Sequence, residues 1–517
     1  MAIIPLPKEM VCTGGELCTN GSMQLDLGEF SDLTEVFVEK LTQLLQWNIA
    51  THNESTPIMV TKKNAALAKE AYILKISKKQ VRIEASTEHG IYYGFLTFLQ
   101  HAVSEKNIPC VEIHDGPKHE YRGFMLDCSR HFIPMTEILK LIDNASEMKM
   151  NRFHWHLTDD QGWRLAIAAM PELTSKEPEG VDIISTRGYY SKQEILDVVK
   201  YAKKRMVEIV PEIDIPGHTL GLLHHHPELA CIPGQFTIAT SPGISEDVLC
   251  PGKDTTYQVL YTILDEVAEL FPYPVIHIGG DEVPKSRWLD CEDCRKKAKE
   301  EDMSTPKELE TYFLQTIVDY LNAQGKTVML WNDALMDHGI HGNVICEFWM
   351  TQDTDKLDDL VDYYPVIDAN FNYYYLDYPI EIISLKKTYE YVSIFRKNEL
   401  RGLIGHECPI WTELIDSREV LYDRVYPRLF AAGEGGWTED DQKSYTDFIN
   451  RLSKLDAWFK SKGIILPDMQ RYDVKGMKKS KVMIKHYARM INLKTIKIAM
   501  KMKKQNHLKF GEATWKN

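Results

Sequence analysis

Short apolar runs alternate with segments of helical periodicity from about residue 118 onward, and this alternation constrains the fold more than any other feature. Buried parallel strands take the form of continuous apolar runs, and a helix usually connects one parallel strand to the next. Eight runs have this character: residues 123–127, 152–159, 207–214, 275–279, 327–332, 344–349, 366–370 and 403–408.

The segments between these runs predict helices. Helical spacing of apolar residues extends over 135–150, 192–205, 255–270 and 306–322, and the last segment begins with a capping box at Thr305. Eight β units that alternate with helices predict an α/β protein with a (β/α)₈ TIM barrel, somewhat longer than the typical ~250 residues.

A helix over residues 445–462 is expected to complete the eighth unit of this barrel. A doubly wound open sheet is the alternative architecture. The sequence has no Gly-x-Gly-x-x-Gly loop, and this weakens the dinucleotide-binding version of that alternative.

Changes in pattern divide the chain into three parts. Residues 1–115 are predicted to form a small α+β domain, because two β-rich runs at 72–77 and 80–85 are typical of a hairpin. Residues 116–465 are assigned to the barrel, which we expect to be the catalytic domain. Residues 466–517 are predicted to form a C-terminal helical segment with a basic tail. The first part carries no catalytic constellation and is expected to act as a scaffold.

The C-terminal segment is rich in Lys and Met. Ile484, Tyr487, Met490, Ile491 and Leu493 are predicted to share one apolar side of a helix. A basic amphipathic tail can bind an anionic surface, but a packed terminal helix or a loose tail is the favoured interpretation, because basic faces are usually only solvated.

Charge and hydropathy exclude some classes of protein. The formal net charge is −14, which argues against general nucleic-acid binding. The sequence contains no run of about 18 apolar residues, so no membrane span is predicted. The first residues lack a basic region followed by an apolar one, so no signal peptide is expected. The chain has ten tryptophans and 25 tyrosines. Their flat rings can stack on the C–H faces of sugars, but they can equally well pack in an ordinary core.

Ten cysteines show no dense disulfide framework in their spacing. Cys291 and Cys294 form a Cys-x-x-Cys pair. A zinc site needs a second pair at suitable spacing, and Cys250 alone does not supply one. We therefore expect no metal, and a structural or disulfide role for this pair is favoured.

Two adjacent carboxylates, Asp281 and Glu282, follow the apolar run at 275–279 and two glycines. Like charges side by side raise the pKa of one member, which can then act as an acid near neutral pH. The alternative is a strand end with two solvated acids.

In a barrel of this kind the chemistry lies at the carboxyl ends of the strands. Aromatic walls with carboxylates are more typical of a sugar-cleaving pocket than of a phosphate or hydride site. The predicted strand ends carry Asp127, Arg130, His154, His156, Asp159, Asp160, Asp214, His218, Asp281, Glu282, Trp331, Asp333, Trp349, Tyr375, Asp377, Trp411 and Glu413.

Five blocks, at residues 122–132, 153–160, 211–218, 277–283 and 411–413, resemble the signature blocks of glycoside hydrolase family 20, the β-N-acetylhexosaminidases. They occur in the order found in that family. The His-x-Gly-Gly-Asp-Glu block is very specific when it occurs together with the other four blocks. The resemblance covers roughly the first 465 residues and leaves out the last ~50.

The resemblance implies an exo-acting, retaining enzyme that releases terminal non-reducing N-acetylglucosamine, with N-acetylgalactosamine as a second candidate, from β-linked glycans. Family 20 departs from the usual pair of flanking carboxylates, since the 2-acetamido oxygen of the substrate is the nucleophile and gives an oxazoline-type intermediate. No metal or organic cofactor is required. An extracytoplasmic compartment (periplasmic, secreted or lysosomal) is implied if a signal was removed.

The resemblance also assigns roles. Glu282 is expected to be the general acid and later the base, and Asp281 to hold the acetamide N–H. Tyr375 is expected to donate to the acetamide oxygen. Asp159 and His218 are expected to orient and tune Glu282; the alternative for this pair is a buried ion pair with no catalytic duty.

Six further residues are expected to bind the sugar. The tryptophans wall the pocket, and the charged residues bind ring hydroxyls: Trp331, Trp349, Trp411, Arg130, Asp377 and Glu413.

Two alternatives remain. One is a family member that acts on a disaccharide or a sulfated N-acetylhexosamine. The other is a sugar-binding protein without catalysis, which would be expected to lack Asp281, Glu282 or Tyr375; all three are present.

Overall fold

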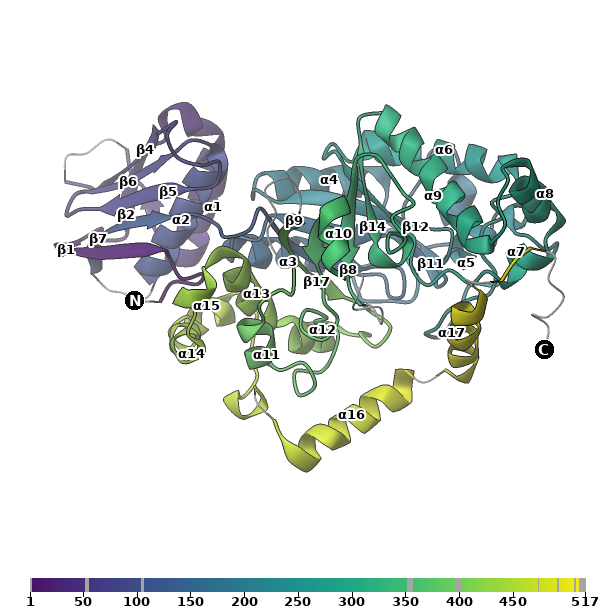
Figure 1. Ribbon diagram of the computed structural model, residues 1–517. Helices are drawn as coiled ribbons and strands as arrows, with labels where there is room; N and C mark the ends of the chain where they lie inside the picture. The colour runs from purple at the N-terminus through teal and green to yellow at the C-terminus, as the bar shows by residue number, and fades with distance from the viewer. Residues whose placement is uncertain are drawn as a thin grey trace.

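A computed structural model gives the architecture of the chain (Figure 1). It describes residues 2–51, 55–103, 107–350, 357–395, 402–472, 474–490, 492–505 and 508–510.

Eight parallel strands close into a barrel, in the spatial order β12-β13-β14-β15-β16-β17-β8-β9. The predicted TIM barrel is thereby confirmed, and the open-sheet alternative is excluded. Every residue of β8, β9 and β13 is buried, as expected for strands covered on both faces. The strands are β8 (Tyr121–Asp127), β9 (Arg152–His156), β12 (Glu208–Ile215), β13 (Val275–Gly279), β14 (Thr327–Trp331), β15 (Val344–Phe348), β16 (Pro365–Asp368) and β17 (Gly402–Ile410).

Helices surround this barrel (Figure 1). Thr305 caps α9, as its sequence predicts, through a reciprocal capping box with Glu308. The main helices are α3 (Met135–Glu147), α4 (Lys192–Lys203), α6 (Asp254–Leu270), α9 (Pro306–Ala323), α10 (Leu357–Tyr363), α11 (Leu385–Glu390), α12 (Arg418–Val425) and α13 (Arg428–Trp437).

The helix that covers the eighth strand is α13, so the prediction that residues 445–462 would do so was wrong. Those residues form α14 (Tyr445–Lys454) and α15 (Asp456–Ser461), and α14 packs against α11 and α15. Three glycines lower the helix propensity of α13. They also let it approach β8 and β17, since a Cβ on Gly436 would lie 2.5 Å from the ring of His406.

Before the barrel, a seven-stranded sheet has the order β1-β7-β5-β6-β4-β2-β3. The predicted hairpin is present as the antiparallel pair β5 and β6. Helix α2 (Glu88–Val103) packs on these strands, and α1 (Thr34–Leu45) packs on α2. The strands are β1 (Glu9–Leu17), β2 (Ser22–Asp26), β3 (Asn48–Ile49), β4 (Ile58–Lys63), β5 (Tyr72–Ile76), β6 (Gln80–Ala85) and β7 (Ile108–Asp115).

The C-terminal residues form α16 (Gly476–Met490) and α17 (Leu493–Gln505), which extend past the barrel (Figure 1). The side of α16 that packs carries Val482, Met483 and His486, whereas Ile484, which we predicted on the apolar side, is 71% exposed. Tyr378 selects this side, since its ring lies 4.8 Å from that of His486. Ile491 lies outside the described residues.

Among the described helices, none is both long and apolar enough to cross a membrane.

A buried ion pair joins the N-terminal sheet to the barrel. Lys149 Nζ, after α3, lies 3.0 Å from Asp115 Oδ2 at the end of β7 and 2.9 Å from the hydroxyl of Tyr72. Trp437 Nε1 donates to the other oxygen of Asp115 at 2.9 Å. Lys149 and Trp437, from different elements, thus both bond to Asp115. Together they satisfy its buried carboxylate, which water does not reach.

We expect Lys149→Met to destabilise the protein by about 3–5 kcal/mol, because it leaves the carboxylate of Asp115 buried without its cation. Urea unfolding measures this change. Lys63→Met is the matched control, since Lys63 pairs with Glu29 where both side chains are about half exposed; such surface pairs contribute roughly 0–1 kcal/mol. Equal losses in the two variants would show that the buried pair does not stabilise the junction.

Candidate active site

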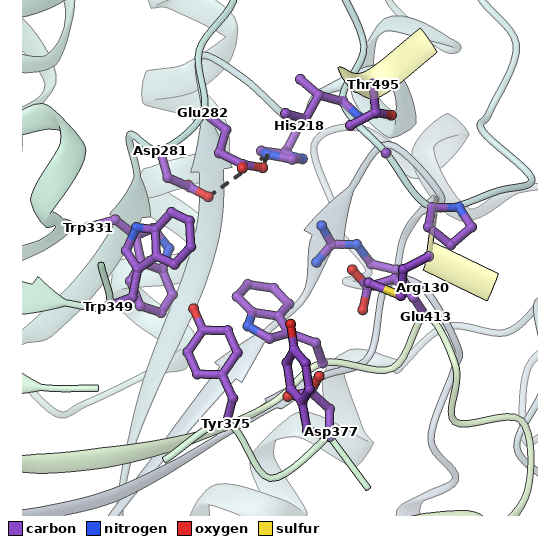
Figure 2. Close-up of a pocket in the computed structure, with 16 residues that line it drawn as sticks. Arg130, His218, Asp281, Glu282, Trp331, Trp349, Tyr375, Asp377, Glu413 and Thr495 are labelled. Atoms are coloured by element: carbon purple, nitrogen blue, oxygen red, sulfur yellow. Dashed lines mark hydrogen bonds and ion pairs between the residues drawn. The ribbon is translucent and has the colours of Figure 1, made fainter. Parts of the chain in front are cut away.

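One pocket opens at the carboxyl ends of the barrel strands (Figure 2), and all of the predicted site residues except Asp159 line it. Its volume is about 270 Å³. The lining residues are Arg130, His218, Pro242, Gly243, Ile244, Asp281, Glu282, Trp331, Trp349, Tyr375, Asp377, Tyr378, Trp411, Glu413, Met490 and Thr495.

The end of β13 turns sharply, and this turn brings two consecutive carboxylates to the pocket. Gly279 and Gly280 have φ of 69° and 89°, and Glu282 has φ of 48°. A Cβ on Gly279 would lie 1.7 Å from Asp214 Oδ1, so only glycine fits there. A non-glycine residue in this region costs of order 1–3 kcal/mol, which the surrounding structure must offset.

A buried chain of charges leads from the barrel wall to these carboxylates. Arg130 Nη2 lies 2.7 Å from Asp159 Oδ2, and His218 Nδ1 lies 3.1 Å from Asp159 Oδ1. On its other side, His218 Nε2 lies 3.7 Å from Glu282 and 3.9 Å from Asp281 (Figure 2). Asp159 therefore lies behind the pocket and reaches it through His218.

The charges in this chain shift one another's pKa. Burial opposes the charged form of His218, but Asp159 and Glu282 outweigh burial and raise the pKa of His218 well above its ordinary value. Burial opposes ionisation of Asp159 also, yet Arg130 and His218 hold its pKa far below the usual range.

Asp281 behaves differently from its neighbours. Burial, together with the adjacent carboxylate of Glu282, raises the pKa of Asp281 to about 7, and the cationic His218 opposes this shift. The side chain of Glu282 is more open, with 36% of it exposed, against 12% for Asp281. The two carboxylates therefore have different surroundings although they are neighbours in sequence.

Aromatic rings form one wall of the pocket beside Asp281. The rings of Trp349 and Trp411 each lie 6.4 Å from that of Tyr375, and those of Trp331 and Trp411 are 6.0 Å apart. Figure 2 shows the hydroxyl of Tyr375 directed toward Asp281, with Trp331 and Trp349 beside that carboxylate. These rings make a flat apolar slot next to the carboxylates of Asp281 and Glu282.

The other side of the pocket is charged. The guanidinium of Arg130 lies 4.8 Å from the ring centre of Trp411. Within the described residues, the buried Oδ1 of Asp377 has no hydrogen-bond partner, and burial raises the pKa of Asp377 and of Glu413. A buried polar atom without a partner is costly, so Asp377 is available to a ligand hydroxyl.

Several other strand-end residues have partners within the protein instead. Asp127 accepts hydrogen bonds from the backbone N–H and the hydroxyl of Thr412, both at 3.0 Å. His154 is buried beside Glu407 at 2.7 Å. Asp160 accepts from a backbone N–H at 3.0 Å. These residues belong to the barrel interior and its loops and do not line the pocket.

The C-terminal segment contributes pocket residues that the sequence did not reveal. Met490 and Thr495 line the pocket. Thr495 Oγ1 accepts a hydrogen bond from Ile244 N at 3.3 Å, and Asn492 Nδ2 donates to Pro242 O at 3.0 Å. The composition of the tail predicts a helix, but only the tertiary fold brings it to the loop at 242–244.

Comparisons with known proteins agree with this geometry. The family model "Glycosyl hydrolase family 20, catalytic domain" matches residues 119–440, and that of domain 2 matches residues 1–116. A β-hexosaminidase of Porphyromonas gingivalis is 32% identical over 484 residues, covering 87% of this chain. The chain spans 62% of the length of that relative. A β-hexosaminidase of Vibrio furnissii is 31% identical over 84% of this chain and 76% of its own length.

Solved structures show the same architecture. A β-N-acetylhexosaminidase from Bacteroides fragilis superposes with a TM-score of 0.81 at 28% identity, covering 92% of this chain and 99% of that one. An exo β-N-acetylglucosaminidase from Vibrio harveyi, in complex with N-acetylglucosamine, has a TM-score of 0.80 at 27% identity, covering 90% and 78%. The predicted resemblance is thereby confirmed, and the chain belongs to glycosyl hydrolase family 20.

Proposed function

We propose that the chain is an exo-acting, retaining β-N-acetylhexosaminidase that removes terminal non-reducing N-acetylglucosamine, with N-acetylgalactosamine as a second sugar, from β-linked glycans. The observation that carries this proposal is the pair of consecutive carboxylates, Asp281 and Glu282, beside an aromatic slot. Residues from one strand end reach one region of a bound sugar, which suits a reaction in which the substrate supplies its own nucleophile.

In the proposed reaction Glu282 gives its proton to the glycosidic oxygen. The 2-acetamido oxygen attacks the anomeric carbon, the bond to the leaving group breaks, and an oxazolinium ion forms. Glu282 then takes a proton from water, which attacks the same carbon and restores the acetamide, so the configuration is retained. The open surroundings of Glu282 support this role, because water and a leaving sugar must both reach it.

Asp281 is proposed to accept a hydrogen bond from the acetamide N–H and to stabilise the positive charge of the oxazolinium. Tyr375, whose hydroxyl is directed toward Asp281 in Figure 2, would donate to the acetamide oxygen. Trp331 and Trp349 would enclose the acetamide methyl. An apolar slot that excludes water strengthens these electrostatic interactions.

His218 and Asp159 are proposed to position Glu282 and to stabilise its carboxylate once the proton has left. Arg130 holds Asp159 and also faces the pocket, where it would bind ring hydroxyls together with Asp377. Trp411 and Glu413 would complete this outer side of the site.

The size of the pocket supports exo action. Its volume of about 270 Å³ lies just below the roughly 300–1,000 Å³ typical of ligand pockets. An adjoining cavity of about 520 Å³, which shares Arg130 and Glu413 with it, leaves room for the rest of the glycan. A single terminal sugar fits the smaller space better than an internal stretch of glycan. A glycan substrate and an extracytoplasmic site of action follow from the family and stay predictions.

Glu282→Gln is expected to lower kcat by roughly 10²–10⁴-fold on substrates with poor leaving groups, because general acid catalysis typically contributes that much. KM should change little. The exposed Glu419 offers a control variant, Glu419→Gln, which should keep the normal rate. Steady-state kinetics on a chitobiose substrate measures both. A near-normal rate for Glu282→Gln would remove this residue from the role of acid.

Hydrolysis of aryl β-glycosides of N-acetylglucosamine, N-acetylgalactosamine and glucose tests the acetamide mechanism. We expect the enzyme to cleave only the glycosides of the N-acetyl sugars. A thiazoline mimic of the oxazoline should inhibit this cleavage, and the Asp281→Asn variant should lose it. Cleavage of the glucoside at a similar rate would point to a carboxylate across the pocket as nucleophile. No cleavage of any of them would favour a disaccharide or sulfated substrate.

The pH dependence tests the link between His218 and Asp281. If Asp281 must be ionised, kcat/KM rises with pH as this group loses its proton near pH 7. His218→Asn removes a cation that lowers the pKa of Asp281, so the acidic limb should move to higher pH by roughly one unit or more. If His218→Asn lowered kcat/KM equally at every pH and left the acidic limb of the profile where it was, His218 would have a purely structural role.

A further inference from the structure

Four cysteine sulfurs converge at one point beside the active-site loops. Cys250 Sγ lies 3.6 Å from Cys291 Sγ and 3.5 Å from Cys294 Sγ, and Cys231 Sγ lies 3.7 Å from Cys294 Sγ. All four sulfur atoms lie within 4.8 Å of one another. All ten cysteines, each in the described part of the chain, are free thiols.

These distances match a shared metal ion. In a tetrahedron with Zn–S bonds of about 2.3 Å, neighbouring sulfur atoms are about 3.8 Å apart. A disulfide would draw two sulfurs to about 2.05 Å and separate them from the others. Cys250 is instead almost equally close to Cys291 and Cys294, as expected when several sulfurs surround one centre.

The fold supplies the second pair of ligands that the sequence spacing did not reveal. An isolated antiparallel bridge joins Ala230 to Leu249, and Cys250 N donates to Leu229 O at 2.9 Å. The residues that follow the two bridged positions, Cys231 and Cys250, are thereby brought together. The sequence spacing offered Cys250 alone as a partner for Cys291 and Cys294, and Cys231 was missed because this bridge takes the place of the short spacing of a second Cys-x-x-Cys.

The first pair lies at the start of α8 (Glu292–Glu300), where Cys291 occupies the N-cap position. The positive end of a helix favours thiolate over thiol. On the other side, Lys253 Nζ donates to Ala230 O at 2.6 Å, next to Cys231. The helix end reduces the cost of a centre with four thiolates and a net charge of −2, and Lys253 holds the backbone beside Cys231 in place.

The surroundings are closed, as in structural zinc sites with four protein ligands. Cys250, Cys291 and Cys294 are buried in a small apolar cluster with Val283 and Trp288. This cluster is separate from the main core of the barrel. A separate small core gains most from a cross-link, because few apolar contacts hold it.

We propose that Cys231, Cys250, Cys291 and Cys294 bind one zinc ion as a tetrathiolate site that fastens together two active-site loops. The loop that follows β12 carries His218, Cys231 and Cys250. The loop that follows β13 carries Glu282 and leads to α8 through α7 (Ser286–Asp290). Val283 packs in the apolar cluster of the cysteines and directly follows Glu282, so the ion would act on the position of Glu282 and take no part in the reaction.

Elemental analysis of the full-length chain, produced with zinc in the medium and purified without chelators, tests the proposal independently of activity. We expect one zinc per chain, released on titration with a mercurial that blocks thiols. After denaturation with chelator, all ten cysteines should react as thiols. No bound metal, iron in place of zinc, or a mass lower by four hydrogens, as two disulfides require, would overturn it.

A matched pair of variants locates the ion. Cys294→Ser should reduce zinc to less than about a tenth of an equivalent and lower Tm by at least about 5 °C. Cys346→Ser replaces a buried thiol outside the cluster and should retain the full equivalent. Zinc retained by Cys294→Ser, or lost from both variants, would place the ion elsewhere. Should Cys294→Ser not fold, the metal and thiol analysis of the unmodified chain still decides.

Discussion

The buried ion pair of Arg130 and Asp159 is the interaction on which the rest of the site depends. Two charges removed from water repay their desolvation only when the geometry is close and the remaining polar atoms are hydrogen-bonded. Here Asp159 has both oxygens engaged, one by His218 and the other by Arg130 and His156. Asp159 and His156 belong to the second barrel unit, His218 to the third and Arg130 to the first. The charged His218 beside Glu282 therefore requires the closed barrel, and a partly folded chain could not hold it.

Local patterns in the sequence were sufficient for the barrel and for most of the pocket. Strands buried on both faces are continuous apolar runs, and closure of the barrel brings their polar ends to one edge. Asp281 and Trp331 could therefore be assigned to one site from neighbouring strand ends. The roles given to these residues came from the family resemblance, and they stay predictions.

Local sequence patterns did not predict the features that depend on tertiary packing. The glycines of α13 lower its propensity but allow its close contact with β17, so the helix was assigned to the wrong residues. The bridge between Ala230 and Leu249 joins cysteines 19 positions apart in sequence, which no short motif records. The packed side of α16 was predicted only in part. Tyr487 lies beside the ring of Tyr378 and Met490 lines the pocket, whereas Ile484 is exposed and His486 packs on Tyr378 in its place.

Glu282 connects these observations. Its left-handed backbone is strained, and such strain persists only when the structure on both sides fixes it. On the preceding side, Gly279 lies against Asp214 with no room for a Cβ. On the following side, Val283 is packed among the cysteines. A zinc ion at the cysteines would hold together the side chains on which Val283 packs. A free glutamate at a strand end would sample many positions, whereas a proton donor must lie within hydrogen-bond reach of one oxygen of the substrate. The strained turn, the charge chain and the cysteine cluster all restrict the same side chain.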